Sequence, residues 1–315
     1  MGTQSYTAPK NNSENRLEDF NQHRSLLFAI AYRMLGSVMD AEDMVQETFL
    51  RWQKNSEQAI DSTKAYLTTI ITRLCIDHLR SARVRREQYV GPWLPEPIVT
   101  EQSADPIASV ELSDSLAMAF LVLLERLSPI ERAVFLLRQV FDYDYEEISR
   151  IVEKSPTNCR QIARRARQHL ALEKSRFQAN PQQQERLTQQ FMQASSQGDL
   201  QGLLDLLADD VTLWSDGGGK VVAVLKPLHG AQKVARFLRA IHRRAKKTGA
   251  IPQVEQVQVN GQAGLLYSVA GGIETVVSLV AIDNQIQSLY FIRNPDKLRL
   301  SLSSNSDNGN LMTES

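Results

Sequence analysis

The segment from Ser128 to Leu170 constrains the fold of this chain more than any other, because it specifies three helices joined by tight turns. Ser128, Pro129 and Glu131 form a capping box and predict a helix start. A second helix is predicted from Tyr145, and a third after Ser155. The inward face of that third helix carries apolar and small residues, namely Cys159, Ile162, Ala163, Ala166 and Leu170. The pattern predicts a helix-turn-helix.

The outward face of the third helix is rich in arginines, amides and hydroxyls. It carries Ser155, Thr157, Asn158, Arg160, Gln161, Arg164, Arg165 and Arg167. Arginine binds guanine through two hydrogen bonds, asparagine and glutamine bind adenine, and further basic side chains hold phosphates. We therefore predict that this helix enters the major groove of DNA. The alternative is an ordinary helical bundle with a solvated basic face.

The rest of the composition narrows the class of protein. With 315 residues the chain can form two or three domains, and its 36 basic residues equal its 36 acidic ones, so DNA binding has to come from local clustering of charge. Cys75 and Cys159 match no CxxC pattern, which predicts buried thiols in a reducing cytoplasm, with no disulfide, metal site or cofactor. We see no signal peptide or membrane span, so we expect a cytoplasmic protein without a membrane partner.

The N-terminal part is predicted to be a helical bundle after a polar, disordered segment over residues 1–16. Helical periodicity covers residues 17–36, then Asp40 to Trp52, then Lys64 to about Gln88. The third of these helices ends in arginines, and positive charge beside Tyr66 or Trp52 would suit a DNA single strand, whose bases stack on aromatic rings. His78 is predicted to pack in the bundle.

Three segments resemble a known family. DAEDMVQETFLRW (residues 40–52), AYLTTIITRLCIDHLR (65–80) and LERLSPIERAVFLLRQVFDYDYEEISRIV (124–152) resemble, in order, the two DNA-binding domains of bacterial RNA polymerase sigma factors of the sigma-70 family. The small extracytoplasmic-function group is the most similar. The resemblance implies two all-α domains, region 2 over residues 17–89 and region 4 over residues 111–177, with core RNA polymerase and promoter DNA as partners.

The resemblance also implies roles for individual residues. The clamp helices of the polymerase largest subunit are expected to contact Asp40, Asp43, Gln46 and Glu47. The minus-ten promoter element is expected to contact Asn55, Asp61, Arg73, Asp77, Arg80 and Arg83, with the loop from Asn55 to Asp61 capturing a base extruded from the stack. The helix after Ser155 would contact the minus-thirty-five element. Housekeeping sigma factors carry a larger set of aromatic residues for strand separation, whereas this chain has little beyond Trp52 and Tyr66. We therefore expect less efficient promoter melting and more stringent promoter selection.

The segment over residues 90–110 contains Pro92, Pro95, Pro97 and Pro106 and is predicted to be an extended tether. Trp93 and Leu94 are large apolar side chains in this tether, so another part of the chain is expected to cover them. The string WLPEP resembles a linker signature of sigma factors that carry an additional C-terminal domain.

The C-terminal domain is predicted over residues 183–298 and is followed by a disordered tail over residues 299–315. Helices are expected after Gln183 and over residues 231–245, with strands in an antiparallel sheet. The expected strands cover residues 211–214, 221–225, 254–259, 265–270, 275–282 and 286–292. This order resembles the SnoaL-like α+β cone of polyketide cyclases and ketosteroid isomerases, and the DGGGK and NPDKL strings resemble segments of the same sigma subgroup.

The role that we favour for this domain is regulation of the sigma domains in cis. The sequence leaves open whether the domain activates or inhibits them. The expected regulatory contacts are Trp93, Leu94, Pro95, Asp216, Asn294, Pro295, Asp296 and Lys297, and the cone could hold a small-molecule ligand. Catalysis is the disfavoured alternative: Asp216 and His229 are the candidate proton-transfer groups, lined by Trp214, Tyr290 and Arg293. The chain is thus predicted to be a non-enzymatic sigma factor, and a helix-turn-helix regulator acting without polymerase remains the other alternative.

Overall fold

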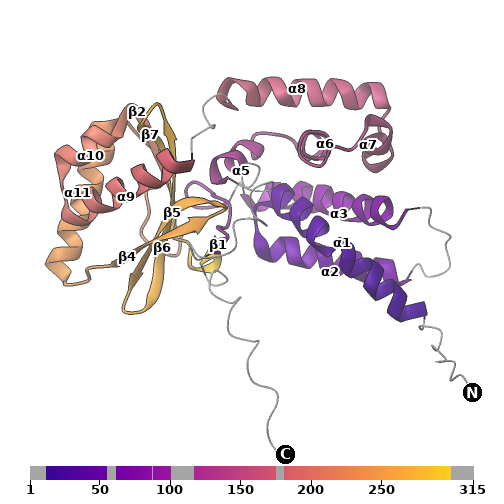
Figure 1. The fold of residues 1–315 in the computed structure, drawn as a ribbon, viewed down its shortest axis with the longest axis horizontal. Coiled ribbons are helices and arrows are strands. Elements are labelled where there is room, and N and C mark those ends of the chain that lie inside the picture. Colours follow the sequence, from indigo (N-terminus) through magenta and orange to yellow (C-terminus); the bar gives the residue numbers. More distant parts are fainter. Residues whose placement is uncertain (1–11, 55–61, 87, 101–116, 175–180, 299–315) are drawn as a thin grey trace, which may run out of the picture. The chain divides into compact units, whose positions relative to one another are not determined.

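The computed structural model describes residues 12–54, 62–86, 88–100, 117–174 and 181–298 (Figure 1). Within these ranges, residues 12–15, 82–86 and 171–174 are described by their backbone alone. The chain forms two compact units, residues 1–81 with 127–166, and residues 82–126 with 167–315.

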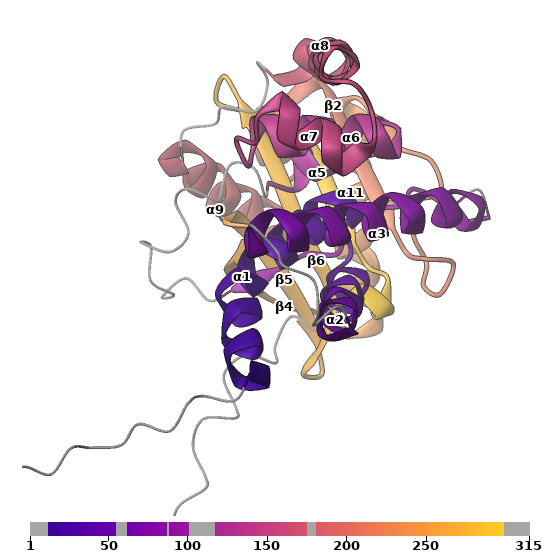
Figure 2. The ribbon, with the colours of Figure 1, turned by 90° about the vertical axis from the view of Figure 1, so that its right-hand side faces the viewer.

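The first unit is helical. It contains α1 (Asn12–Leu35), α2 (Val38–Lys54), most of α3 (Thr63–Arg86), α6 (Pro129–Gln139), α7 (Tyr145–Val152) and the first part of α8 (Pro156–Lys174). Figure 2 shows α6 and α7 beside α3. The core includes Leu27, Ile30, Leu67 and Ile71, all at most 1% exposed. This helical content agrees with the predicted all-α class of this part of the chain.

The first helix begins at Asn12, inside the segment that we expected to be disordered. Its first turns are held by the side chain of Trp52, whose indole N–H donates to the Arg16 carbonyl over 3.1 Å. The Arg16 guanidinium lies 4.0 Å from the Trp52 ring centroid and donates to the Trp52 carbonyl. The prediction of disorder up to residue 16 is therefore wrong for residues 12–16, because the tertiary contact with Trp52 stabilises a helix that the polar composition of these residues does not favour.

The second unit is built on a mixed sheet of seven strands in the order β1-β4-β5-β6-β7-β2-β3. The strands are β1 (Val99–Thr100), β2 (Leu207–Asp216), β3 (Leu228–His229), β4 (Gln253–Val259), β5 (Gln262–Val269), β6 (Gly272–Ile282) and β7 (Gln285–Ile292). The helices are α5 (Met118–Leu124), α9 (Pro181–Gln197), α10 (Leu200–Leu206), α11 (Ala231–Thr248) and the short η2 (Pro295–Lys297).

The two faces of this sheet have different coverings. On one face, Val277, Leu289 and Phe291 form a core with apolar residues of α9, α10 and α11. On the other face, Tyr290 and Ile292 cluster with Leu94 of the linker and with Met118 and Ala119 of α5. Alternate residues of β7 therefore serve both cores, as the two-residue period of a strand requires.

Two details of the predicted cone are wrong. Residues 221–225 form no strand, because the chain from Gly217 folds back in turns before β3. The sheet is also not purely antiparallel, since β2 pairs with β7 in parallel, with Leu213 opposite Leu289. The other expected strands and the helix from residue 231 are present.

Candidate functional site

The helix-turn-helix is built by local capping. Ser128 with Glu131 and Asp144 with Glu147 both form complete capping boxes at the starts of α6 and α7. Glu153 ends α7 in the left-handed conformation, at φ 54° and ψ 48°, and so turns the chain sharply toward α8. The Ser155 hydroxyl then accepts a hydrogen bond from the Asn158 N–H over 3.2 Å. These caps and turns produce the predicted helix-turn-helix.

The helix α8 presents the predicted side chains outward. Cys159, Ala163 and Ala166 are fully buried. Asn158 is half-buried, and the other residues predicted to contact the minus-thirty-five element are exposed. Arg160 is held over the Tyr145 ring at 5.3 Å, while the structure records no ion pair for Arg164 and Arg165 among the residues that it describes. Arg164 and Arg165 are therefore available to bind an external anion.

The helix α2 carries the predicted acidic residues on its solvent side. Asp43 and Gln46 are exposed, and Glu47 forms a 2.8 Å ion pair with Arg51. The half-buried His78 lies 3.6 Å from Asp40, which fits its predicted packing in the bundle. Gln46 also lines a groove of about 340 Å³ between α1 and α2, together with Leu17, Phe20, Asn21, Arg24, Val45, Phe49 and Leu50. Leu50 is 49% exposed, so this surface combines polar and apolar contacts.

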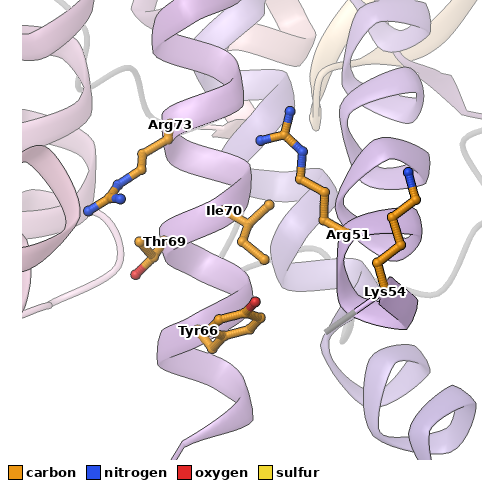
Figure 3. Close-up of a pocket in the computed structure, with 6 residues that line it drawn as sticks. All are labelled: Arg51, Lys54, Tyr66, Thr69, Ile70 and Arg73. Carbon is orange, nitrogen blue, oxygen red and sulfur yellow. The ribbon is translucent and has the colours of Figure 1, made fainter. Parts of the chain in front are cut away.

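A second hollow, of about 390 Å³, lies between α2 and α3 (Figure 3). Its lining is basic and aromatic, and it consists of Arg51, Lys54, Tyr66, Thr69, Ile70 and Arg73. Of these, only Arg73 was among the residues predicted to bind the minus-ten element. Arg51 and Lys54 were missed, although their spacing of three residues places them on one side of α2. Trp52 is 3% exposed and supports Arg16, so the suggestion that it stacks on DNA is wrong.

Arg73 does not project freely into solvent. Its Nε donates to the Ile151 carbonyl over 2.9 Å, and one terminal nitrogen donates to the Arg150 carbonyl over 2.8 Å. The other terminal nitrogen lies 3.1 Å from the Glu153 carboxylate. Arg73 of α3 thus binds the carbonyl end of α7, where the helix dipole favours a cation.

Two buried contacts join the helix-turn-helix to α3 and to α1. The Tyr143 and Thr68 hydroxyls are hydrogen-bonded over 2.9 Å, and the Arg132 guanidinium donates to the Met34 carbonyl over 2.6 Å. Burial lowers the pKa of Arg132 to about 9 and raises the pKa of Tyr143. The described helices of the first unit are therefore held together by polar contacts in their core.

The remaining minus-ten candidates are not brought together. Asp77 and Arg80 form an ion pair with each other over 3.2 Å, and both are more than half exposed. Asn55 and Asp61 lie outside the described residues, as does the side chain of Arg83.

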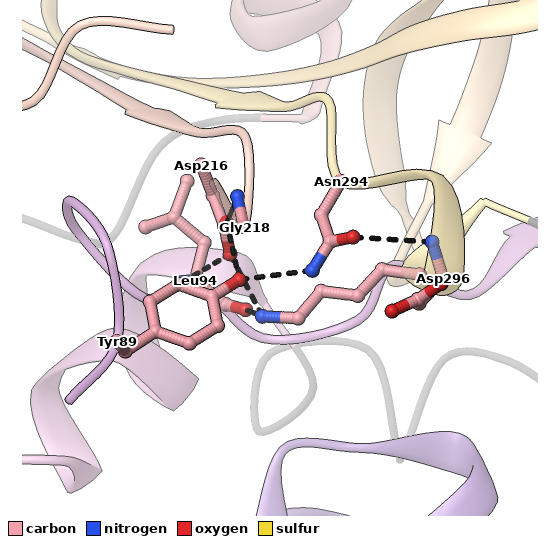
Figure 4. A network of polar contacts seen from close by, with 7 residues as sticks. Tyr89, Leu94, Asp216, Gly218, Asn294 and Asp296 are labelled. Carbon is pink, nitrogen blue, oxygen red and sulfur yellow. Dashed lines mark hydrogen bonds and ion pairs between the residues drawn. The ribbon is translucent and has the colours of Figure 1, made fainter. Parts of the chain in front are cut away.

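The linker docks on the C-terminal domain through a buried carboxylate (Figure 4). Asp216, at the end of β2, is 0% exposed. Its two oxygens accept hydrogen bonds from the Tyr89 hydroxyl over 2.6 Å, the Leu94 N–H over 2.9 Å and the Gly218 N–H over 3.0 Å. The Lys297 ammonium completes this set at 2.7 Å. We call Tyr89, Leu94, Asp216, Asn294 and Lys297 the linker clasp.

The other members of the linker clasp reinforce it. Lys297 also donates to the Leu94 carbonyl, and its ammonium lies 4.1 Å from the Trp93 ring centroid. The Asn294 amide donates to the Tyr89 hydroxyl over 2.9 Å. The pKa of Tyr89 is raised by burial, by its hydrogen bond to Asp216 and by the charge of that carboxylate. Two of the four donors to Asp216, the Tyr89 hydroxyl and the Leu94 N–H, come from the linker, so undocking of the linker removes half of the partners of this buried carboxylate.

Further along, the linker becomes a strand of the sheet. Asn260 holds Ile98 by two hydrogen bonds, from the Asn260 N–H to the Ile98 carbonyl over 2.8 Å and from the Ile98 N–H to the Asn260 side chain over 3.2 Å. Val99 then pairs with Val259 in β4. Leu94 is 1% exposed, which agrees with the expectation that its apolar side chain is covered. The linker from Tyr89 to Thr100 is thus part of the C-terminal unit rather than a solvated tether.

The contacts of the linker clasp agree in part with the predicted regulatory set. Trp93, Leu94, Asp216, Asn294 and Lys297 meet as expected, and Pro95 is buried. Asp296 instead forms an ion pair with Lys220 at the surface. Tyr89 and Asn260 were missed. Tyr89 precedes the proline-rich segment, and Asn260 is followed by glycine, a pair that indicates only a turn.

The candidate catalytic groups do not converge. Asp216 is occupied by the linker clasp, whereas His229 lies on β3, where its ring nitrogen is 3.1 Å from the Thr212 hydroxyl. Trp214 and Tyr290, predicted to line the cone, stack on each other at 5.0 Å on the face that the linker covers. Among the described residues, no cluster of three or more His, Cys, Asp or Glu side chains is arranged to hold a metal ion. The helices of the described ranges likewise include none that combines the length and apolar character needed to cross a membrane.

The chain has relatives along most of its length. Residues 20–85 match the family Sigma-70 region 2, and residues 117–170 match the family Sigma-70, region 4. The ECF RNA polymerase sigma factor SigJ of Mycobacterium tuberculosis is 34% identical over 290 residues, which cover 89% of this chain and 92% of that protein. The probable ECF RNA polymerase sigma factor SigI of the same organism is 34% identical over 279 residues, 88% of this chain and 92% of that protein.

A solved structure is also similar. The crystal structure of M. tuberculosis SigJ aligns with a TM-score of 0.71 at 33% identity, covering 91% of this chain and 98% of that chain. The similarity therefore includes the C-terminal helix-plus-sheet domain as well as both helical domains.

Proposed function

Because the chain belongs to the extracytoplasmic-function sigma factors of the sigma-70 family, we propose that α2 and α8 bind core RNA polymerase and promoter DNA and that the linker clasp restrains this activity. The observation that carries the proposal is the burial of Asp216 against both the linker and Lys297. A regulatory contact of this kind joins the C-terminal domain to the segment between the two DNA-binding domains.

Promoter contacts are assigned from exposure and charge. Arg164 and Arg165 of α8 are exposed, and we assign them to the minus-thirty-five element. We assign the hollow with Tyr66, Arg51 and Lys54 to the minus-ten strand, since it offers cations for phosphates and a ring for a base. On α2, Asp43 and Gln46 are assigned to the clamp helices of the polymerase. The grouping of Gln46 with exposed Leu50 favours a protein partner there.

Arg73 links DNA binding to a change in the first unit. In the structure its guanidinium binds the α7 carbonyls and Glu153, so these contacts compete with a phosphate for its N–H donors, and the Glu153 carboxylate repels a phosphate. We propose that promoter binding requires Arg73 to leave α7. The state with Arg73 on α7 is then a closed state.

No covalent chemistry is part of the proposed function. This is supported by the occupation of Asp216 by the linker and by the placement of His229 on a different part of the sheet edge. Apolar side chains of α9, α10 and α11 pack on one face of the sheet. Binding of a small-molecule ligand in the cone therefore stays a prediction. Action in the cytoplasm follows from the proposed polymerase partner.

The proposal is tested by transcription from a pool of genomic promoters with purified core polymerase and the full chain. The expected result is a set of promoter-specific transcripts that increases with Asp216→Asn, because loosening the linker clasp frees the linker. His229→Ala is the matched control, since this exposed residue of the same domain lies outside the linker clasp. Absence of specific transcripts with both the unmodified chain and the Asp216→Asn variant would reject the sigma function, and equal transcription by the two proteins would reject the restraint.

A further inference from the structure

The helix α11 of the C-terminal domain is strongly basic. Its 18 residues contain no aspartate or glutamate. Its cations are Lys233, Arg236, Arg239, Arg243, Arg244, Lys246 and Lys247. The whole chain is neutral, so this helix concentrates positive charge that acidic residues elsewhere balance.

Five of these cations form a continuous stripe. Lys233, Arg236, Arg239, Arg243 and Lys247 follow one another at intervals of three or four residues, which places them on one side of a helix. We call them the α11 basic face. Arg239 is half-buried and the other four are exposed. For these five, the structure records no ion pair with any residue in the ranges that it describes.

Folding of the domain does not account for the α11 basic face. Cations in the last turn of a helix favour its dipole, which explains Lys246 and Lys247, but Lys233 lies in the first turn, where a cation is unfavourable. Like charges at intervals of three or four residues also destabilise an isolated helix. The opposite side of α11, with Val234, Ala235 and Leu238, is the part that is buried in the core.

The arrangement fits the backbone of double-stranded DNA. From Lys233 to Lys247 the helix rises about 21 Å, at roughly 1.5 Å per residue. This length corresponds to about six base pairs at roughly 3.4 Å each. A lipid surface fits less well, because the apolar side of α11 is already used inside the domain and cannot insert.

We propose that the α11 basic face binds the phosphate backbone of duplex DNA independently of base sequence, as a second DNA contact outside the helix-turn-helix. Its role goes beyond the proposed promoter recognition by α8. It raises affinity for DNA of any sequence and leaves promoter choice to α8. Since binding is measured with the chain alone, the outcome is separate from sigma activity.

The test measures binding of the full chain to a labelled duplex without a promoter, over a series of salt concentrations. The variant Lys233→Gln, Arg236→Gln, Arg243→Gln, Lys247→Gln removes four exposed cations and leaves the buried side of α11 intact. Each phosphate contact contributes about 0.9 to the slope of log K against log salt, so the loss of four contacts should lower the magnitude of the slope by about 3.6. The affinity at low salt should fall at least about tenfold.

Two controls define the effect. Arg236→Lys with Arg243→Lys keeps the charges, and should bind duplex DNA as the unmodified chain does. Arg236→Gln with Arg243→Gln is a milder variant with about half the loss of slope, should the fourfold variant not fold. Circular dichroism establishes that each variant is folded.

Three results would overturn the proposal. These are a lack of duplex binding by the unmodified chain at low salt, an unchanged slope in the fourfold variant, and a loss of affinity for core polymerase while duplex binding stays constant. The last result would assign the α11 basic face to an acidic protein surface instead.

Discussion

The linker clasp makes a quantitative prediction for Asp216→Asn. The asparagine has nearly the shape of the aspartate but carries no charge, and its amide group donates where the carboxylate accepted. Lys297 is then left as a cation whose side chain is 10% exposed, without its carboxylate. The new NH2 group also faces two donors: Tyr89 and Gly218 if it replaces Oδ1, or Leu94 and Lys297 if it replaces Oδ2.

The expected cost is large because both charges are buried. Removing one partner of a buried ion pair costs about 3–5 kcal/mol. Exposed ion pairs such as Lys220 with Asp296 contribute only about 0–1 kcal/mol, so Asp296→Asn is a matched control within the same loop region. The cost of Asp216→Asn should appear as loosening of the linker rather than as global unfolding, because the apolar cores of the sheet are untouched.

Hydrogen exchange of the Ile98 amide is a suitable assay. This N–H donates to Asn260, so it reports docking of the linker without contacting the substituted side chain. A loss of about 3 kcal/mol corresponds to roughly a hundredfold faster exchange. The Ile148 amide in α7 belongs to the other compact unit and serves as internal reference.

A double-mutant cycle separates charge pairing from packing. Lys297→Met alone leaves the Asp216 carboxylate without its cation, and the double variant removes both charges. The double variant should therefore lose less stability than the two single variants summed, by about 1–3 kcal/mol. Additive effects, or unchanged exchange at Ile98 in Asp216→Asn, would refute the reasoning that the buried pair holds the linker.

Arg164→Ala should weaken holoenzyme binding to its promoter by about 1–3 kcal/mol if the side chain binds a base edge, as measured by competition between promoter fragments; equal losses on all sequences would show a phosphate contact instead. Asp43→Ala with Gln46→Ala should lower affinity for core polymerase in a pull-down titration and leave thermal stability unchanged, because both residues are exposed; unchanged core affinity would exclude them from the interface. The raised pKa of Tyr89 means that its neutral form stabilises docking fully below its ordinary pKa of about 10 and that this contribution is lost as pH rises toward the raised value. Exchange at Ile98 should therefore accelerate above about pH 10 in the unmodified chain and not in Tyr89→Phe, beyond the general effect of pH on exchange.

The local structure of the helix-turn-helix could be predicted because short-range chemistry specifies it. The capping boxes at Ser128 and Asp144 involve residues three positions apart, and the small inner face of α8 follows helical periodicity. The exposed placement of Arg164 and Arg165 follows from the same periodicity. The burial of Leu94 could likewise be predicted, because its side chain is hydrophobic. The residues that cover it could not be predicted.

The contacts of Arg73 and Tyr89 could not be predicted in the same way. Arg73 binds carbonyls 77 and 78 residues away, and Tyr89 binds a carboxylate 127 residues away. A basic residue on α3 looks alike in sequence whether it faces DNA or the end of another helix. The early start of α1 could not be predicted for the same reason. It depends on Trp52, which lies far away in sequence and stabilises residues whose own composition is polar.

The sequence by itself determined the sigma family, the helix-turn-helix with its basic outer face and the presence of an α+β C-terminal domain, because each is encoded by periodicity, capping and motifs within a few turns of chain. Only the tertiary structure decided which donors Asp216 binds, with Tyr89 among them, and that Arg73 is occupied by α7. Those roles depend on which groups meet across long loops, where burial and the need to satisfy every buried charge select one partner among many.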